Sequence, residues 1–197
     1  MTTQTTEFAD EVVTRSLVRY VELPGLAGPI ALITLENGRD HTRPSTFGPA
    51  GLSSLDNALD EIAAHSPTVS AIAVTGKPFI FAVGADLSGI PLVRTREEAL
   101  QIGELGQRVF RRLYDSTIPT FAFVNGAAMG GGLELALHCQ YRTLSTGVAA
   151  IALPEVSRTT RPAPSFIPQR ATRPEVGAAI CELIAAYHHP SIFSGWT

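Results

Sequence analysis

The sequence has few of the residues that mark several large classes of protein. Cysteine occurs only at positions 139 and 181, too rarely and too irregularly for a disulfide framework or a zinc site. Lysine occurs once, at Lys77, and the net charge is −3, so no basic surface for nucleic acid is indicated. Residues 1–16 are rich in Thr and carry acids, so they do not resemble a signal peptide. We therefore expect a cytoplasmic protein that binds no nucleic acid.

A long uninterrupted hydrophobic run is also missing. The most apolar stretch, residues 118–137, contains Pro119, Asn125, several glycines and Glu134, which argue against a membrane helix. The 197 residues, 45% hydrophobic and 17% charged, are enough for one globular domain with a substantial core.

The apolar periodicity predicts strands alternating with helices. Helical spacing of apolar residues covers 51–65, and a second helix begins at a Thr95–Glu98 capping box and continues to Leu113. Strands are expected at 17–23, 30–35, 69–75, 79–83 and 141–145, and an apolar run at 148–153. The alternation favours an α/β fold.

The most informative stretch is IPTFAFVNGAAMGGGLELAL, residues 118–137. A buried strand runs into a predicted Asn125-Gly126 turn, then three glycines (130–132), and then a helix. The first N–H groups of a helix lack intrahelical partners, and glycine lets a ligand approach them closely. With Glu134 in the first turn, this arrangement suits an oxyanion that develops during a reaction. A tight strand–turn–helix junction without chemistry is the plain alternative; a dinucleotide or P-loop motif does not fit the glycine spacing.

A second glycine-punctuated strand end, FAVGADL at residues 81–87, can supply another backbone N–H. Two such donors make an oxyanion hole. Glu134 and Glu155 can divide acid and base roles if burial separates their pKa values. Alternatively, Glu134 only complements the helix N-terminus and Glu155 is a surface acid. Glu134 and His138 are one turn apart, but without a third ligand we expect no metal.

These motifs resemble the crotonase (enoyl-CoA hydratase/isomerase) superfamily. The resemblance rests on FIFAVGADLSGI, on PTFAFVNGAAMGGGLELALHCQYRTLS and on ALPEV, in that order, and covers about residues 15–157. It is strongest to the hydratase part of bacterial multifunctional fatty-acid-oxidation subunits.

The resemblance implies a spiral of repeated ββα units and a thioester substrate of coenzyme A, with no further cofactor. The thioester oxygen would be held by the N–H groups of Ala85 and Gly131, which follow Gly84 and Gly130. Glu134 would activate water and Glu155 would protonate the α-carbon, which predicts hydration of a trans-2-enoyl-CoA in fatty-acid β-oxidation. An isomerase, an acyl-CoA hydrolase or an inactive remnant of the same fold are the alternatives. The resemblance also allows a contact between Lys77 and a CoA phosphate.

The sequence departs from the family pattern after residue 157. Residues 158–174 form an Arg/Pro-rich linker and residues 175–197 an atypical helical tail, where the family has a Gly/Pro segment that lines the acyl pocket. We therefore expect residues 1–157 to form an incomplete, C-terminally truncated crotonase-like core. Family members form trimers or multienzyme complexes, but we do not expect such an assembly here, because the helices that build the family's trimers are not recognisable in this sequence. Gln140 also stands where the family usually has an acid.

Overall fold

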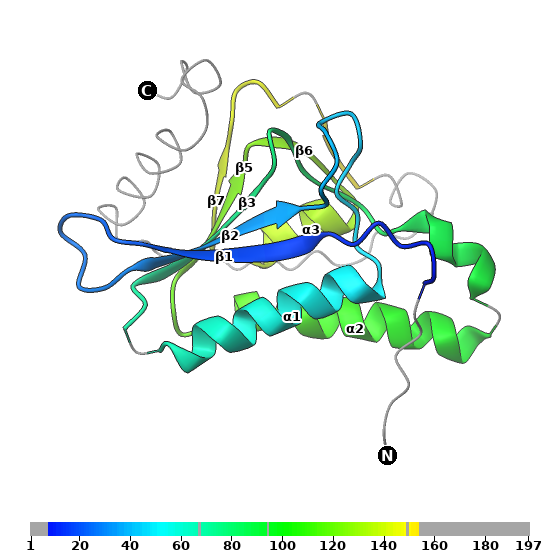
Figure 1. Ribbon diagram of the computed structural model, residues 1–197, viewed down its shortest axis with the longest axis horizontal. Helices are drawn as coiled ribbons and strands as arrows, with labels where there is room; N and C mark the ends of the chain where they lie inside the picture. Colours follow the sequence, from blue (N-terminus) through cyan, green and yellow to red (C-terminus); the bar gives the residue numbers. More distant parts are fainter. Residues whose placement is uncertain (1–7, 67, 94, 149, 154–197) are drawn as a thin grey trace.

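Figure 1 shows the computed structural model of the chain, in which residues 8–66, 68–93, 95–148 and 150–153 are described. Glu155, the expected linker at 158–174 and the expected tail at 175–197 lie outside these residues.

The larger of two sheets has five strands in the order β1-β2-β3-β5-β7. Its edge strand β1 is antiparallel to β2, and the remaining pairs are parallel. The strands are β1 (Arg15–Val21), β2 (Ile30–Glu36), β3 (Ala71–Gly76), β5 (Thr120–Val124) and β7 (Tyr141–Leu144). Strand β2 is buried on both faces: Ala31 and Ile33 belong to one apolar cluster, and Ile30 and Leu32 to a second. Burial on both faces explains its continuous apolar sequence.

The smaller sheet consists of three parallel strands, β4 (Phe79–Val83), β6 (Gly126–Met129) and β8 (Ile151–Ala152), in that order. From β3 onward, strands of the larger and the smaller sheet alternate along the chain, and the strand pairs β3–β4 and β5–β6 are each followed by a helix. Thus β3 and β4 precede α2 (Arg96–Tyr114), and β5 and β6 precede α3 (Gly131–His138). This repeated ββα order confirms the spiral fold that the resemblance implied.

Helices α1 (Pro49–Ala64) and α2 lie side by side under the larger sheet (Figure 1). The apolar face predicted for α1 is buried, with Leu55 and Ile62 at 0% and 1% exposure. The capping box of α2 is present, since the Thr95 hydroxyl accepts from the N–H of Glu98 and the Glu98 carboxylate accepts from the N–H of Thr95. Arg112 of α2 donates to Asp56 of α1, which joins the two helices.

The predicted Asn125-Gly126 turn is wrong, because Gly126 begins strand β6. The segment GAAM lacks the β-branched residues that mark strands. It is a strand because β4 lies on one side of it and β8 on the other. Gly126 is required there: a Cβ at this position would lie 2.0 Å from the carbonyl carbon of Phe79. A short 3₁₀ helix, η1 (Leu87–Leu92), also follows β4 and had no signal in the periodicity.

Within the described part of the chain, no helix has the length and apolar character needed to cross a membrane.

Candidate active site

The two glycine motifs meet because they end neighbouring parallel strands. In the register of β4 and β6, Val83 lies opposite Met129. Gly84 directly follows β4 and Gly130 directly follows β6. The N–H of Gly84 donates to the Met129 carbonyl at 2.7 Å. Gly84 and Gly130, which are 46 positions apart in sequence, therefore reach the same sheet edge, which is where ligands bind in many parallel sheets.

The peptide group between Gly84 and Ala85 has a fixed orientation. The Gly84 carbonyl accepts from the N–H of Phe47 at 3.0 Å, and the N–H of Asp86 donates to the Phe47 carbonyl at 2.9 Å. In a trans peptide the N–H and C=O point in opposite directions. The Ala85 N–H therefore points away from Phe47. Gly84 has φ +68°, a conformation that glycine adopts without strain and that turns the chain at this point.

The peptide group between Gly130 and Gly131 is oriented in a similar way by α3. The Gly130 carbonyl accepts the first intrahelical bond, from the N–H of Glu134 at 2.9 Å. The Gly131 N–H therefore points out of the helix N-terminus, where the helix dipole is positive. Gly130 has φ +49°, again a glycine conformation. Among the described residues, neither Ala85 nor Gly131 donates its N–H to a protein acceptor.

Gly84, Gly131 and Glu134 lie together. A Cβ placed on Gly131 would lie 3.7 Å from the carbonyl carbon of Gly84, the atom bonded to the Ala85 nitrogen, and 3.9 Å from Glu134 Oε2. Glu134 is exposed, yet its carboxylate bends back over the start of its own helix. The site thus combines two outward-pointing N–H groups, a positive helix end and one carboxylate. Such a group of donors and a base can stabilise an oxyanion and move a proton beside it.

The third glycine of the motif has a purely structural role. A Cβ on Gly132 would lie 2.0 Å from the Ala82 carbonyl oxygen, so only glycine lets α3 pack this closely on β4. The three consecutive glycines therefore serve different purposes: Gly130 turns the chain, Gly131 leaves the site open, and Gly132 allows close packing.

The second predicted carboxylate, Glu155, lies outside the described residues. The strand that precedes it, β8, runs parallel to β6 with Ala152 opposite Met129, and the Ala152 carbonyl accepts from the N–H of Gly130 at 2.9 Å. Strand β8 therefore ends at the same sheet edge as β4 and β6.

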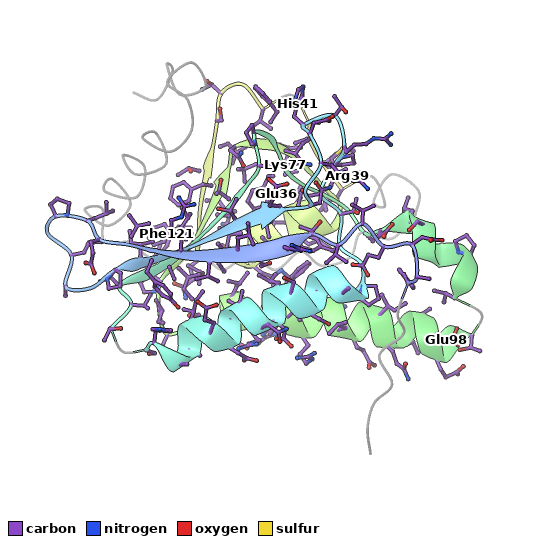
Figure 2. All side chains as sticks on the ribbon, viewed as in Figure 1. Glu36, Arg39, His41, Lys77, Glu98 and Phe121 are labelled. Carbon is purple, nitrogen blue, oxygen red and sulfur yellow. The ribbon has the colours of Figure 1, made fainter. Side chains whose placement is uncertain are left out.

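Lys77 is neither a solvated turn residue nor placed for a phosphate. Its side chain is buried, and Nζ donates to Asn37 Oδ1 at 2.5 Å and to the carbonyls of Arg39 and Asp40 at 3.0 and 2.9 Å. Figure 2 shows Lys77 beside Glu36 and Arg39. Burial lowers the pKa of the Lys77 ammonium, although the nearby carboxylate of Glu36 opposes the shift. Lys77 holds the loop after β2 in place.

Other candidate groups have structural partners. Burial raises the pKa of the Cys139 thiol to about 12, so it stays neutral and is a poor nucleophile. His138 Nδ1 lies 2.8 Å from the Glu134 carbonyl oxygen and donates a hydrogen bond to it, so this nitrogen is not free to bind a metal. In the described ranges, no group of three His, Cys, Asp or Glu side chains is arranged to hold a metal ion.

Sequence reasoning missed the segment that orients Ala85. Residues 45–47 run alongside the end of β4: the Ser45 carbonyl accepts from the N–H of Val83 at 2.7 Å, and Phe47 forms a parallel bridge with Ala85. Phe47 is 5% exposed. A lone apolar residue in a loop rich in Pro, Ser and Thr was the available signal.

Comparison with known proteins identifies relatives over most of the chain. Residues 27–184 match the family model described as enoyl-CoA hydratase/isomerase, a range that extends beyond the motifs ending near residue 157. The fatty acid oxidation complex subunit alpha of Shewanella halifaxensis is 36% identical over 130 residues, covering 64% of this chain and 18% of the relative. The corresponding subunit of Aliivibrio fischeri is 34% identical over 129 residues, with the same coverage. The chain thus spans under a fifth of the length of these relatives.

Solved structures share the fold. The structure of Pseudomonas aeruginosa DspI has a TM-score of 0.59 at 27% identity, covering 79% of this chain and 58% of that chain. An enoyl-CoA hydratase from Bacillus anthracis has a TM-score of 0.61 at 21% identity, covering 74% and 53%. A Mycobacterium tuberculosis enoyl-CoA isomerase has a TM-score of 0.54 at 23% identity, covering 66% and 52%. The last two likenesses concern the fold alone.

Proposed function

Because the chain belongs to the enoyl-CoA hydratase/isomerase family, we propose that it adds water to the double bond of a trans-2-enoyl-CoA. The observation that carries the proposal is the meeting of the Gly84–Ala85 and Gly130–Gly131 peptide groups at one sheet edge, beside Glu134. The names of the curated relatives support fatty-acid β-oxidation as the setting.

In the proposed reaction, the N–H groups of Ala85 and Gly131 hold the thioester oxygen. Glu134 takes a proton from water as the water oxygen attacks the β-carbon, and the electron pair of the double bond moves toward the thioester oxygen. Glu155 gives a proton to the α-carbon, which completes the 3-hydroxyacyl thioester. The enolate-like charge on the oxygen is greatest in the transition state, so loss of one donor would cost about 3–4 kcal/mol.

An isomerase is the main alternative, because one neighbour of the same fold carries that name. Glu134 favours hydration, since the resemblance implies that family isomerases retain only the acid at the position of Glu155. The acyl-CoA hydrolase, the inactive remnant, the cytoplasmic location and the assembly into trimers or larger complexes stay predictions.

The test uses the full chain with crotonyl-CoA. We expect the enoyl absorbance to fall and mass spectrometry to detect the water adduct, with Glu134→Gln lowering kcat by about 10²–10⁴-fold, the usual contribution of a general base. Glu104→Gln, an exposed acid on α2, is the matched control and should retain full activity. Conversion of a 3-enoyl-CoA without hydration, release of free CoA, or no turnover by the intact chain would each contradict the proposal.

A further inference from the structure

The two peptide groups of the candidate site are held by different parts of the fold. Phe47, just before α1, orients the Gly84–Ala85 peptide through its backbone. The Gly130–Gly131 peptide is oriented by α3, through the bond from the N–H of Glu134 to the Gly130 carbonyl. Two N–H groups can share one oxygen only if their supports keep a fixed separation, so a contact between these supports matters for catalysis.

Phe110 on α2 makes contact with both supports. Its ring centroid lies 5.6 Å from that of Phe47, in an edge-on arrangement at 72°. It also lies 5.8 Å from the ring centroid of His138, at 52°. Phe110 is 6% exposed, so its ring is buried where it packs against both. Aromatic pairs prefer such tilted geometries, which makes their spacing specific.

His138 connects this packing to α3. Its Nδ1 lies 2.8 Å from the Glu134 carbonyl oxygen. A carbonyl oxygen only accepts hydrogen bonds, so Nδ1 carries the proton and donates it. This hydrogen bond holds the imidazole against the turn of α3 that contains Glu134. A displacement of the ring would therefore displace that turn as well.

We propose that Phe110 is a positioning residue that sets the distance between the Ala85 and Gly131 N–H groups, by packing against both Phe47 and His138. This inference rests on the proposed function, because it concerns donors to a thioester oxygen. Phe110 touches no reacting atom. Its loss would misplace the donors relative to the transition state while leaving the rest of the substrate-binding surface in place.

The test compares Phe110→Leu with Leu113→Ala, both in the full chain. Leu113 lies one turn further along α2 and is fully buried, so Leu113→Ala reports the effect of a core cavity alone. We expect Phe110→Leu to lower kcat by about tenfold or more, because a displacement of about 1 Å costs up to 10²-fold. KM and the affinity for butyryl-CoA, measured by calorimetry, should change by less than about twofold, as expected when only transition-state binding is lost. Leu113→Ala should lower the melting temperature but leave kcat of the folded protein unchanged.

A second pair of variants avoids the core. His138 is only partly buried, so His138→Ala removes one side of the packing with little risk to folding. We expect it to lower kcat, and His138→Phe to recover part of the loss, because it restores a ring against Phe110 but not the hydrogen bond to the Glu134 carbonyl.

The outcomes separate the inference from the proposed function. Equal effects of Phe110→Leu and Leu113→Ala on kcat, or no recovery with His138→Phe, would overturn the positioning role while the wild type still turns over substrate. Failure of the wild type itself to hydrate an enoyl-CoA would overturn the proposed function, and the inference with it.

Discussion

Gly131 and Gly132 are adjacent, but the structure predicts opposite results when each is replaced by alanine. At Gly131 the new Cβ meets its nearest atoms at 3.7 Å, an ordinary van der Waals distance, and the residue lies in a helix where alanine is favoured. We expect Gly131→Ala to leave the free energy of unfolding unchanged or to raise it by about 0.5–1 kcal/mol.

At Gly132 the Cβ would lie 2.0 Å from the Ala82 carbonyl oxygen and 2.4 Å from its carbonyl carbon. These are backbone atoms of β4, so α3 or the strand must move by about 1 Å to reach even the 3.0 Å limit. Overpacking against side chains costs about 1–3 kcal/mol, and backbone is less able to yield, so we expect a loss of about 3 kcal/mol or more.

Activity should change in the opposite sense: Gly131→Ala, the more stable of the two variants, should be the one that impairs catalysis. The methyl group of Gly131→Ala would lie 3.7 Å from the Gly84 carbonyl carbon and 3.9 Å from Glu134 Oε2, beside the N–H groups proposed to hold the thioester oxygen. We expect kcat/KM for crotonyl-CoA to fall by about 10²–10³-fold, the effect of losing one oxyanion donor. Urea unfolding followed by circular dichroism gives the stability, and loss of enoyl absorbance gives the activity. A stable Gly131→Ala variant with wild-type kcat/KM would refute the proposal that the thioester oxygen binds beside Gly131.

Three further changes test the framework around the site. Asn125→Asp keeps the shape of a buried side chain that bonds both the N–H and the C=O of Gly76, but removes its donors, so urea unfolding should show a loss of about 2–4 kcal/mol. Glu11→Ala removes the carboxylate that accepts from two N–H groups at the start of α1, at 2.9 and 2.7 Å, and should lower stability by about 1–2 kcal/mol; no change in the melting temperature would contradict this. Burial tends to raise the pKa of Asp56, but hydrogen bonds from Arg112 and Arg108 outweigh burial and lower this pKa. The Asp56 carboxylate therefore contributes its full stabilisation above the ordinary pKa of 3.8, and this contribution is lost as pH falls through the folded-state pKa. The stability difference between wild type and Asp56→Asn should therefore be about 1–2 kcal/mol at pH 7 and shrink below pH 3.8; a difference independent of pH would exclude this origin.

Local patterns in the sequence predicted most of the elements. The strand at Phe79–Val83 matches its expected bounds, and the capping box at Thr95 begins α2 as expected. Both depend on neighbours within a few residues, where periodicity and capping chemistry act. Strand β6 was missed because its pairing with β4 and β8 is a long-range interaction that leaves no mark on four small residues.

Burial of polar side chains was also hidden from the sequence. Lys77 is the only lysine, and nothing adjacent to it in sequence explains its burial. Its acceptors lie in the loop at residues 37–40, some forty positions earlier. The partners of Phe47 are likewise distant in sequence, in the segment just after β4 and on α2. Such contacts depend on how elements pack, which composition and spacing do not report.

The sequence by itself determined the alternation of strands and helices, the helix that starts at three glycines, and the identity of the groups available for chemistry at that start. These features follow from local rules of periodicity, capping and glycine geometry. Only the tertiary structure decided that the glycine motifs are neighbours, because the register of β4 against β6 brings Gly84 beside Gly130. It also decided the direction of each N–H, because the carbonyl of each peptide group is held by a residue from elsewhere in the fold or by the first turn of a helix.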